Sequence, residues 1–325
     1  GDAIRIGLAV DEMTLADLEG IAFEHNPTLS AAAARMEIAS GRQFQAGRSP
    51  NPVVGYHATE VGNLGTAGQQ GGFISQRFIT AGKLQLDQQI AGKEIDAAHY
   101  QFHAQEQRVL SDVRVRFYDV LVAQRRVELT KELVDIGDNL VEAAETLLDG
   151  RQGTPNDLLQ AQIRADEAHI LYDNARNELA ESWRRLAATI GQPTMSMKPL
   201  VGQLDIDVPN YEWDDCHTIV LGSNPQLNAA RARVDRAGLS IQRAQKEPIP
   251  NIDASVSVRH IYPTKSDVAN IQIGIPIPIF DKNQGNIRSA EAEWIAANNE
   301  VERIELDLQD RLAVVYRQFA NSRQQ

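Results

Sequence analysis

Histidines, acidic side chains and one cysteine are the residues of this sequence that could do chemistry. His99 and His103 are four residues apart in a predicted helix, so both imidazoles would lie on one helix face and could bind a metal ion. No acidic or cysteine ligand is placed to complete such a site. We therefore interpret the pair as part of a polar helix face, and the sequence predicts no metal site.

Two further clusters resemble functional motifs without matching them. Residues 214–217, DDCH, group possible metal ligands, but neighbours at one helix start point in different directions, so we interpret the two aspartates as helix-start charges. Residues 81–83, AGK, resemble the end of a phosphate-binding loop, yet Arg77 and Leu84 stand where that motif requires Gly and Ser or Thr. The sequence predicts no catalytic residue and no cofactor, and we expect a protein that is not an enzyme.

Composition and charge narrow the class of protein further. The 325 residues are 42% hydrophobic and 23% charged, which is typical of an ordered chain, and the net charge of −12 disfavours nucleic acid as a partner. Cys216 is the single cysteine, so an internal disulfide is excluded. The sequence has no run of 18 apolar residues that would predict a transmembrane helix. Because the chain starts with neither Met nor a signal peptide, we expect that a targeting segment was removed.

An internal repeat organises the chain. Segments 26–52 and 224–250 are 198 residues apart and share eleven of 27 positions without a gap. The shared positions are Asn26, Pro27, Leu29, Ala31, Ala32, Ala34, Arg35, Ala39, Ala46, Pro50 and Pro52. The same offset places Tyr118 on Tyr316. We interpret this as a duplicated unit of helix, proline-ended strand hairpin and long helix.

The repeat predicts four parts of the chain. They are an N-terminal segment with a short helix at 1–25, repeat one at 26–191, a linker with a short helix at 192–223, and an incomplete repeat two at 224–325. Repeat one would hold a helix, a β-hairpin at 53–79, a long helix at 82–149 and a helix at 154–190. Repeat two would hold a helix, a β-hairpin at 251–279 and a long helix from 282.

Long helices dominate repeat one. No proline occurs from 83 to 149, and a seven-residue apolar spacing runs through that stretch. The positions are Val113, Val120, Val127, Val134, Val141 and Leu148. Leucines and isoleucines flank them, so we expect neighbours on two sides of the helix. The connection GRQGT (150–154) is so short that the next helix must return antiparallel, and Thr154 with Asp157 predicts a capping box at its start.

The four predicted strands could form a sheet with one apolar face. Isoleucine occupies every second position of one strand, at Ile271, Ile273, Ile275, Ile277 and Ile279. Pro276 and Pro278 cannot donate to a strand ladder, so we expect the chain to leave the sheet there. Each strand is roughly 9–12 residues long, enough to cross a bilayer when tilted. The same pattern also fits a soluble sheet packed on helices, whereas a membrane sheet would need copies of the chain to pair its edges.

Several of these features together resemble the TolC-like outer-membrane efflux proteins. They are the duplicated Asn-Pro-x-Leu helices, the proline-ended hairpins, the long helical hairpin with a glycine-containing tip, and LAATIGQP (186–193). The stretch SQRFITAGK, with Gln76, Gly82 and Lys83, is most similar to the heavy-metal cation-efflux branch. The resemblance covers nearly the whole chain, from about residue 12 to 325.

The resemblance implies a fold, a location and partners. Three chains with four strands each would form an outer-membrane barrel of about 12 strands, continued by helices in the periplasm. The assembly would be a passive exit duct for metal cations or small toxic compounds, docked to a periplasmic adaptor and an inner-membrane pump. The isoleucine face of 271–279 would contact outer-membrane lipid. The adaptor would contact the tip residues Gly150, Gly153, Thr154, Asp157 and Leu158.

The sequence departs from the family pattern in two ways, and two other functions remain as alternatives. Repeat two stops at Gln325, so we expect a C-terminally truncated chain that lacks most of its second helical hairpin. The N-terminal lipidated cysteine common in the family is also missing. One alternative function is a soluble coiled-coil scaffold with a small β-domain, and another is a type I secretion duct. The direction in which the isoleucines face separates the scaffold from both ducts.

Overall fold

The computed structural model describes residues 12–204 and 209–324, so parts of the predicted N-terminal segment and linker lie outside the described residues. The chain is mainly helical with one small antiparallel sheet, as the sequence predicts. The elements are α1 (Leu15–His25), α2 (Pro27–Ala46), β1 (Val53–Thr59), η1 (Asn63–Gly65), β2 (Gln69–Phe78), α3 (Lys83–Asp149), α4 (Pro155–Thr189), α5 (Trp213–Ser223), α6 (Pro225–Lys246), β3 (Ile252–Ile261), β4 (Ser266–Gly274) and α7 (Gln284–Gln324). Among the described helices, none is both long and apolar enough to cross a membrane.

The chain forms two compact units, and each is described by itself. The first contains Gly1–Ala32 and His103–Asn210, and the second contains Ala33–Phe102 and Tyr211–Gln325. Among its described residues the first unit holds helices and one isolated bridge between Met13 and Leu200, whereas the second carries the sheet. Helices α2 and α3 contribute residues to both units.

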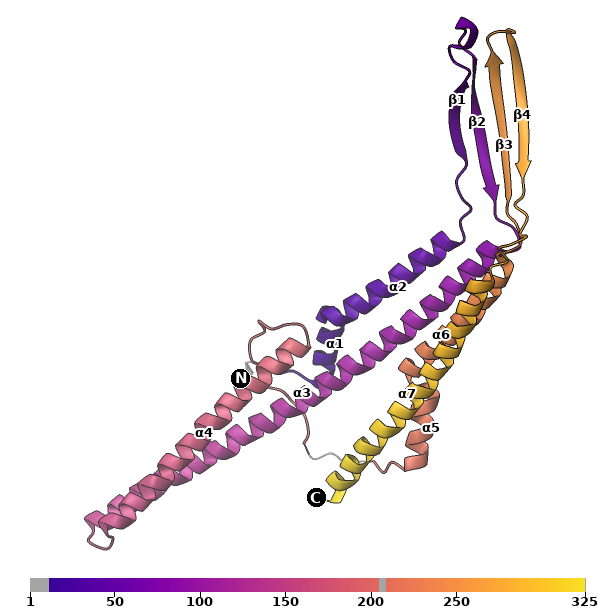
Figure 1. Ribbon diagram of the computed structural model, residues 1–325. Coiled ribbons are helices and arrows are strands. Elements are labelled where there is room, and N and C mark those ends of the chain that lie inside the picture. The colour runs from indigo at the N-terminus through magenta and orange to yellow at the C-terminus, as the bar shows by residue number, and fades with distance from the viewer. Residues whose placement is uncertain (1–11, 205–208, 325) are drawn as a thin grey trace, which may run out of the picture. The chain divides into compact units, whose positions relative to one another are not determined.

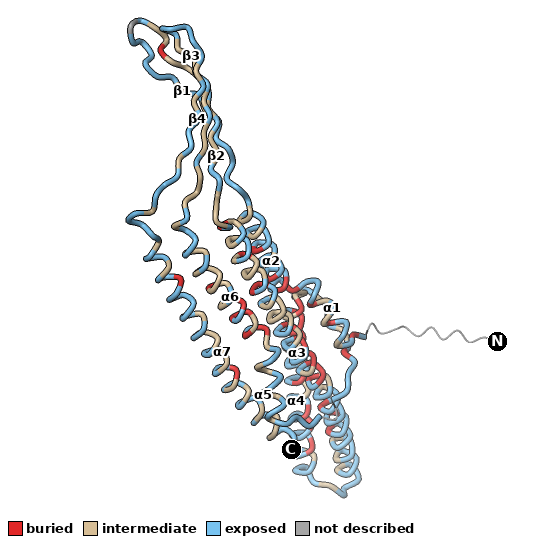
Figure 2. Tube along the Cα trace, turned by 90° about the vertical axis from the view of Figure 1, so that its right-hand side faces the viewer, coloured by how far each residue is buried: buried red, intermediate tan, exposed pale blue. Residues whose placement is uncertain are grey.

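The core of the first unit is built from α1, α3 and α4. Val113 of α3 and Leu186 of α4 have no exposed surface, and Trp183 donates from Nε1 to the carbonyl of Met195 at 3.1 Å. Figure 2 shows the buried positions in red along α1, α3 and α4. The core residues are Met13, Leu18, Ala22, Leu29, Val109, Val113, Phe117, Val120, Leu121, Trp183, Leu186, Ile190 and Leu200. Side chains from α1, α3 and α4 therefore close this core within one chain.

Helices α3 and α4 pack closely because small residues line their contact. The buried alanines of α4 are Ala161, Ala165, Ala168, Ala175 and Ala187. A Cβ atom added at Gly137 of α3 would lie only 3.0 Å from the Cα atom of Ala165, so a side chain there would push the two helices apart by a few tenths of an ångström. Leu133, Ile136 and Leu140 on the flank of α3 stay 46–63% exposed. One side of the wide apolar arc of α3 is therefore covered in this chain and the other is not.

The sheet of the second unit consists of two hairpins joined in the order β1-β2-β3-β4, with every pair antiparallel (Figure 1). Val53 pairs with Ser75, Phe78 with Ile252, and Asp253 with Gly274. The inner pair β2–β3 joins segments that are far apart in the sequence. β1 and β4 are the two edges of the sheet within the chain.

Strand β4 ends earlier in the chain than the strand that the sequence predicts. The predicted strand included all the isoleucines up to Ile279, but β4 ends at Gly274. Ile275, Ile277 and Ile279 follow outside the sheet. A continued ladder would place Ile252 opposite Ile275 and Pro250 opposite Ile277, and Pro250, Pro276 and Pro278 lack the N–H that a ladder needs.

Candidate functional site

The two faces of the sheet differ in chemistry because side chains alternate along each strand. Ser75, Ser255 and Gln272 are directly opposite one another on three neighbouring strands and form the polar face. Ile74, Val256 and Ile271 are opposite one another on the other face. The alternation predicted from the sequence of β3 thus extends in register across the sheet.

The apolar face of the sheet is uncovered in this chain. Val54 is 75% exposed, Ile271 is 77% exposed and Ile273 is 68% exposed, and Ile74 and Val256 are also exposed. A face of this kind in water would lose the stabilisation that burial gives, about 25 cal/mol for each Å² of apolar surface. An uncovered apolar face on a sheet is typical of a surface that meets lipid or another protein.

The apolar face is bounded by polar side chains at one end of the strands and by an aromatic side chain at the other. Towards the hairpin loops, Tyr56 donates from its hydroxyl to Oε1 of Gln70 at 2.5 Å, and His260 Nδ1 lies 2.8 Å from Asp267 Oδ1. Towards the helices, Phe78 is exposed. The apolar band therefore occupies the middle of the strands, between polar pairs at one end and an aromatic ring at the other.

The strand–helix junction of the second unit contains the family-like residues Gln76, Gly82 and Lys83. Gln76 donates from Nε2 to the carbonyls of Pro50 and Arg77, each at 2.8 Å. Gly82 has a φ of +71°, a conformation that L-residues with side chains rarely adopt. This turn directs the chain from β2 into α3, and Lys83 is the first residue of that helix.

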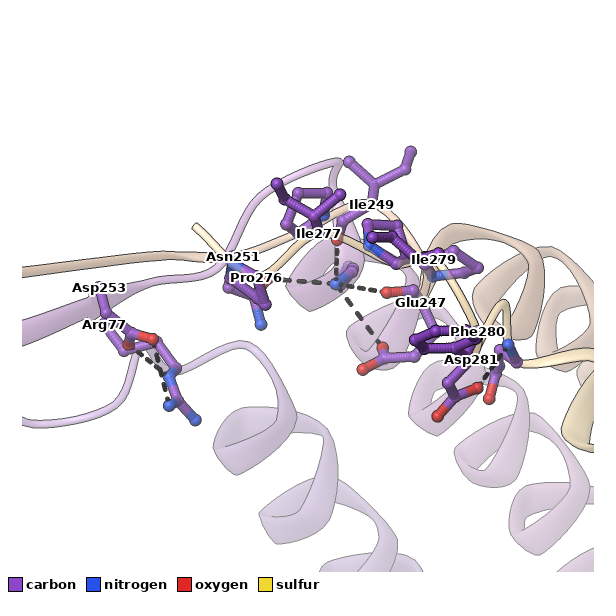
Figure 3. Close-up of a pocket in the computed structure, with 15 residues that line it drawn as sticks. Arg77, Glu247, Ile249, Asn251, Asp253, Pro276, Ile277, Ile279, Phe280 and Asp281 are labelled. Carbon is purple, nitrogen blue, oxygen red and sulfur yellow. Dashed lines mark hydrogen bonds and ion pairs between the residues drawn. The ribbon is translucent and has the colours of Figure 1, made fainter. Parts of the chain in front are cut away.

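Lys83 is the most deeply buried charged residue in the described part of the chain, with 2% of its surface exposed. Its Nζ donates to the carbonyl of Ile249 at 2.6 Å, to the carbonyl of Glu247 at 3.1 Å and to Oδ1 of Asn251 at 3.1 Å (Figure 3). The Glu247 carboxylate lies 3.7 Å from Nζ. All three ammonium donors are therefore satisfied, and the start of α3 is fixed to the segment between α6 and β3.

Two further contacts strengthen this junction. Thr80 donates from Oγ1 to the carbonyl of Pro250 at 2.6 Å. Arg77 and Asp253 face each other across β2 and β3, with Nε 2.7 Å from Oδ1 (Figure 3). A cavity of about 510 Å³ lies beside them and is lined on its other side by Pro276, Pro278 and Asp281. The junction thus joins the first hairpin to the second by side-chain contacts as well as by the strand ladder.

The tip of the α3–α4 hairpin contains all five predicted contact residues. Backbone N–H groups of Gln152 and Gly153 donate to the Leu147 carbonyl at 2.8 and 3.0 Å, which closes the turn. Gly150, Thr154 and Asp157 are exposed, and Leu158 is half-buried. The structure therefore brings Gly150, Gly153, Thr154, Asp157 and Leu158 together at one end of the hairpin.

The predicted capping box at this tip is confirmed. Asp157 accepts from the backbone N–H of Thr154 at 2.9 Å and from its hydroxyl at 2.7 Å, and the Asp157 N–H donates back to Thr154 Oγ1 at 3.3 Å. The hydrogen bond from the Thr154 side chain, followed by that from its backbone, lowers the pKa of Asp157 below the ordinary aspartate value. An ionised Asp157 therefore holds the start of α4.

The other chemical candidates from the sequence have structural roles. His103 Nδ1 lies 2.6 Å from Glu106 Oε2 on its own helix. Asp214 and Asp215 lie in the first turn of α5, as predicted, and the ring of His217 stacks on Trp213. Within the described residues, no group of three or more His, Cys, Asp or Glu side chains could hold a metal ion.

A helical hairpin with a turn at its tip and a pair of strand hairpins with an uncovered apolar face are the architecture that the sequence predicts for an outer-membrane duct. The family description "outer membrane efflux protein" matches residues 20–192 and 218–325. The chain belongs to the outer membrane efflux protein family, and its location is accordingly the outer membrane. The predicted resemblance is confirmed.

Relatives of known name and structure agree with this assignment. The chain is 26% identical to the cobalt-zinc-cadmium resistance protein CzcC of Cupriavidus metallidurans, covering 97% of this chain and 75% of CzcC. It is 22% identical to the alkaline protease secretion protein AprF of Pseudomonas aeruginosa, covering 95% and 69%. The solved structure of CusC, described as forming a transmembrane channel, aligns with a TM-score of 0.72 and 16% identity, covering 97% of this chain and 78% of CusC.

Proposed function

We propose that this chain is the outer-membrane channel subunit of a tripartite efflux system, a passive exit duct for metal cations or small toxic compounds. Family membership supports efflux across the outer membrane. The uncovered apolar face of the sheet is the observation that carries the proposal, because lipid is the environment in which that face is stable. The helices would form the periplasmic part of the duct.

The duct requires more than one chain. The sheet has four strands, and both edges, β1 and β4, are free within the chain. Unpaired strand edges are not stable in hydrocarbon, and four strands do not close a barrel with an interior. Three copies, with β4 of each paired to β1 of the next, would close a barrel of about 12 strands.

The internal duplication predicts the register of that contact. An offset of 198 places Val54 of β1 on Ile252 of β3. Val54 pairs with Ile74 in the first hairpin. In the second hairpin, the β3–β4 register continued by one residue would bring Ile252 opposite Ile275. Ile74 of β2 therefore corresponds to Ile275. By the same shift Phe78 corresponds to Ile279.

The observed β2–β3 pairing can then be transferred to the edges. Phe78 of β2 pairs with Ile252 of β3. By correspondence, Ile279 would pair with Val54 of the next copy. Two residues further along the antiparallel pair, Ile277 would pair with Tyr56 of the next copy. Val54 and Tyr56 lie on the apolar face. The isoleucines that extend past β3 in this chain would thus continue that same face between copies.

Cysteine cross-linking tests this register. Ile277→Cys combined with Tyr56→Cys, in a Cys216→Ser background, should form disulfides between copies and give covalent dimers and trimers in the outer membrane. Within one chain Tyr56 is in register with Ala269 of β4, three strand spacings or about 14 Å away, and Ile277 lies eight residues further along the chain. The two positions are therefore too far apart for a disulfide within one chain. Ile277→Cys with Gly55→Cys, which points to the other face, is the control. Equal cross-linking of both pairs, or of neither, contradicts the register.

The hairpin tip is the proposed contact for a periplasmic adaptor that links the duct to an inner-membrane pump. Gly150 is exposed and its φ is not in the left-handed region, so Gly150→Glu adds bulk and charge without straining the backbone. We expect this change to reduce cross-linking to the adaptor while trimers persist. Gln107→Glu, at an exposed position of α3 far from the tip in sequence, should leave cross-linking to the adaptor unchanged. A full yield of adaptor complex with Gly150→Glu contradicts the contact.

Metal cations are the proposed cargo, because CzcC is a cobalt-zinc-cadmium resistance protein and the chain carries Gln76, Gly82 and Lys83. The similarity to AprF supports a secretion duct as the second candidate. Deletion of the gene should lower growth in Zn²⁺, Co²⁺ and Cd²⁺ and raise their cellular content. Unchanged metal tolerance with loss of an exported protein would favour secretion instead.

A further inference from the structure

A cavity of about 430 Å³ in the second unit is lined by three helices and gathers positive charge from two of them. Arg35 and Arg42 come from α2, and Arg233 and Arg236 come from α6. Glu94 of α3 is the one carboxylate among the described lining residues. The remaining lining residues are Ile38, Ala39, Ala97, Ala98 and Gln101. Four guanidinium groups thus share a site with a single negative charge, in a chain whose net charge is −12.

The arginines of this cavity are incompletely paired. Arg236 donates from Nη1 to Glu94 Oε1 at 3.1 Å, but its Nε is buried and has no hydrogen-bond partner. In the described part of the chain, Arg35, Arg42 and Arg233 make no ion pair within 4.0 Å. Arg233 acts at longer range, where it adds to the effect of Arg303 in lowering the pKa of Glu300.

The buried Nε of Arg236 is costly unless a ligand accepts from it, whereas Arg35, Arg42 and Arg233 are exposed and free to reach a ligand at the cavity mouth. A guanidinium group stays charged at any physiological pH, so the cluster cannot relieve its repulsion by losing a proton. A buried N–H without an acceptor costs about 1–3 kcal/mol. The buried side chains of Ala39, Ala97 and Ala98 form an apolar floor that reduces screening by water.

We propose that this cavity binds a phosphate-class oxyanion, supplied as free phosphate or as the phosphate head group of a lipid. Tetrahedral phosphate offers acceptor oxygens in several directions, which suits guanidinium groups arriving from α2 and α6, and one of these oxygens would accept from Arg236 Nε. The cavity volume lies within the range of about 300–1,000 Å³ that is usual for small-molecule sites. The lining residues of α2 extend away from the sheet, since Arg42 and Arg35 precede the end of that helix at Ala46 by four and eleven residues, roughly 6 and 16 Å. Free phosphate and a lipid head group share the chemistry that the arginines would recognise, and the titrations below distinguish the two sources.

Titration calorimetry on the purified full chain in detergent tests the site. Inorganic phosphate is titrated at constant ionic strength with chloride as the competing anion, and the wild type should bind it saturably. Arg233→Gln/Arg236→Gln should weaken binding at least tenfold. Arg176→Gln, which removes an exposed positive charge of α4, should leave it unchanged. Absence of saturable binding, or equal weakening by the Arg176 change, overturns the proposal.

A second variant separates ligand binding from a purely structural role. Glu94→Gln removes the competing carboxylate, so it should strengthen phosphate binding severalfold even though it deletes an ion pair. Weaker binding in this variant, with an unchanged helical circular dichroism spectrum, contradicts the site. Titration with a short-chain phosphatidic acid below its micelle concentration identifies the source. Binding at least tenfold tighter than that of inorganic phosphate assigns a lipid head group, and similar affinities assign free phosphate.

Discussion

The helical core of the first unit and the sheet of the second unit use the same apolar residue types in opposite ways. In the core, Val113 and Leu186 have no exposed surface, because α1, α3 and α4 cover one another. In the sheet, Ile271 and Val54 are 77% and 75% exposed, because no described element of the second unit covers their face. The number of apolar residues in a segment therefore does not show whether that segment forms a buried core. What matters is whether the chain supplies a second layer.

The largest expected effect is a cavity in the helical core. Leu186→Ala should destabilise the chain by about 2–5 kcal/mol, since the neighbours of this fully buried side chain cannot collapse into the space. Ile273→Ala removes a similar volume from the uncovered face and should cost less than about 1 kcal/mol in detergent. Denaturant unfolding of both variants checks the difference. Equal losses would show that the sheet face is an ordinary protein core.

A charge on the sheet sharpens the same contrast in the membrane. Ile271→Lys should lower the yield of outer-membrane protein, because a lysine on the lipid face of a strand costs about 2–4 kcal/mol near the bilayer centre. Gln272→Lys, the next residue along and on the polar face, is the matched control and should assemble normally. Fractionation of membranes and detection of the folded form give the measurement. Full assembly of Ile271→Lys would contradict contact with lipid.

The junction lies between these two extremes, since it is polar and yet buried. Lys83→Met should destabilise the second unit by about 1–3 kcal/mol, because the carbonyls of Glu247 and Ile249 lose their donor. Lys282→Met, at an exposed lysine in the corresponding connection of the second hairpin, should change stability little. Thermal unfolding compares the two. An unchanged unfolding temperature for Lys83→Met would show that water replaces the ammonium group at no cost.

The smallest effect concerns pH at the hairpin tip. The pKa of Asp157 is lower in the folded chain than in the unfolded chain, so its contribution is complete above the unfolded pKa and is lost as pH falls through the folded pKa. Asp157→Asn should therefore lower the unfolding temperature at neutral pH and make no difference in strong acid. Asp17, whose pKa is lowered by the backbone and then the side chain of Thr14, should behave in the same way. A constant difference at every pH would assign the effect to packing.

Much of the fold follows from local patterns in the sequence. The absence of proline from 83 to 149 predicts one continuous helix, and α3 runs from Lys83 to Asp149. Thr154 and Asp157 predict the start of α4 because their spacing satisfies both free N–H groups at once. The alternation in β3 predicts which side chains share a face. These features depend on neighbours a few residues away, so the sequence contains the information directly.

Features that depend on distant contacts were harder to predict. Lys83 follows a glycine and reads as a surface lysine, and only the closing of β2 on β3 buries it. The arginine cavity draws on α2, α3 and α6, whose residues look like separate solvated faces. The end of β4 depends on where β3 starts. The one available signal for the junction was the stretch with Gln76, Gly82 and Lys83, which the sequence analysis used only as a family resemblance.

The way Lys83 is held has a consequence for the conditions under which the junction is strong. Surface ion pairs such as Arg126 with Glu178 weaken as salt rises, because mobile ions screen exposed charges over about 10 Å or less. Lys83 is held mainly by two backbone carbonyls and an amide oxygen in a place that salt does not reach. A cell that moves between fresh and saline water would therefore change the strength of the exposed pairs, including Arg77 with Asp253, and leave the Lys83 contacts of the junction as they were.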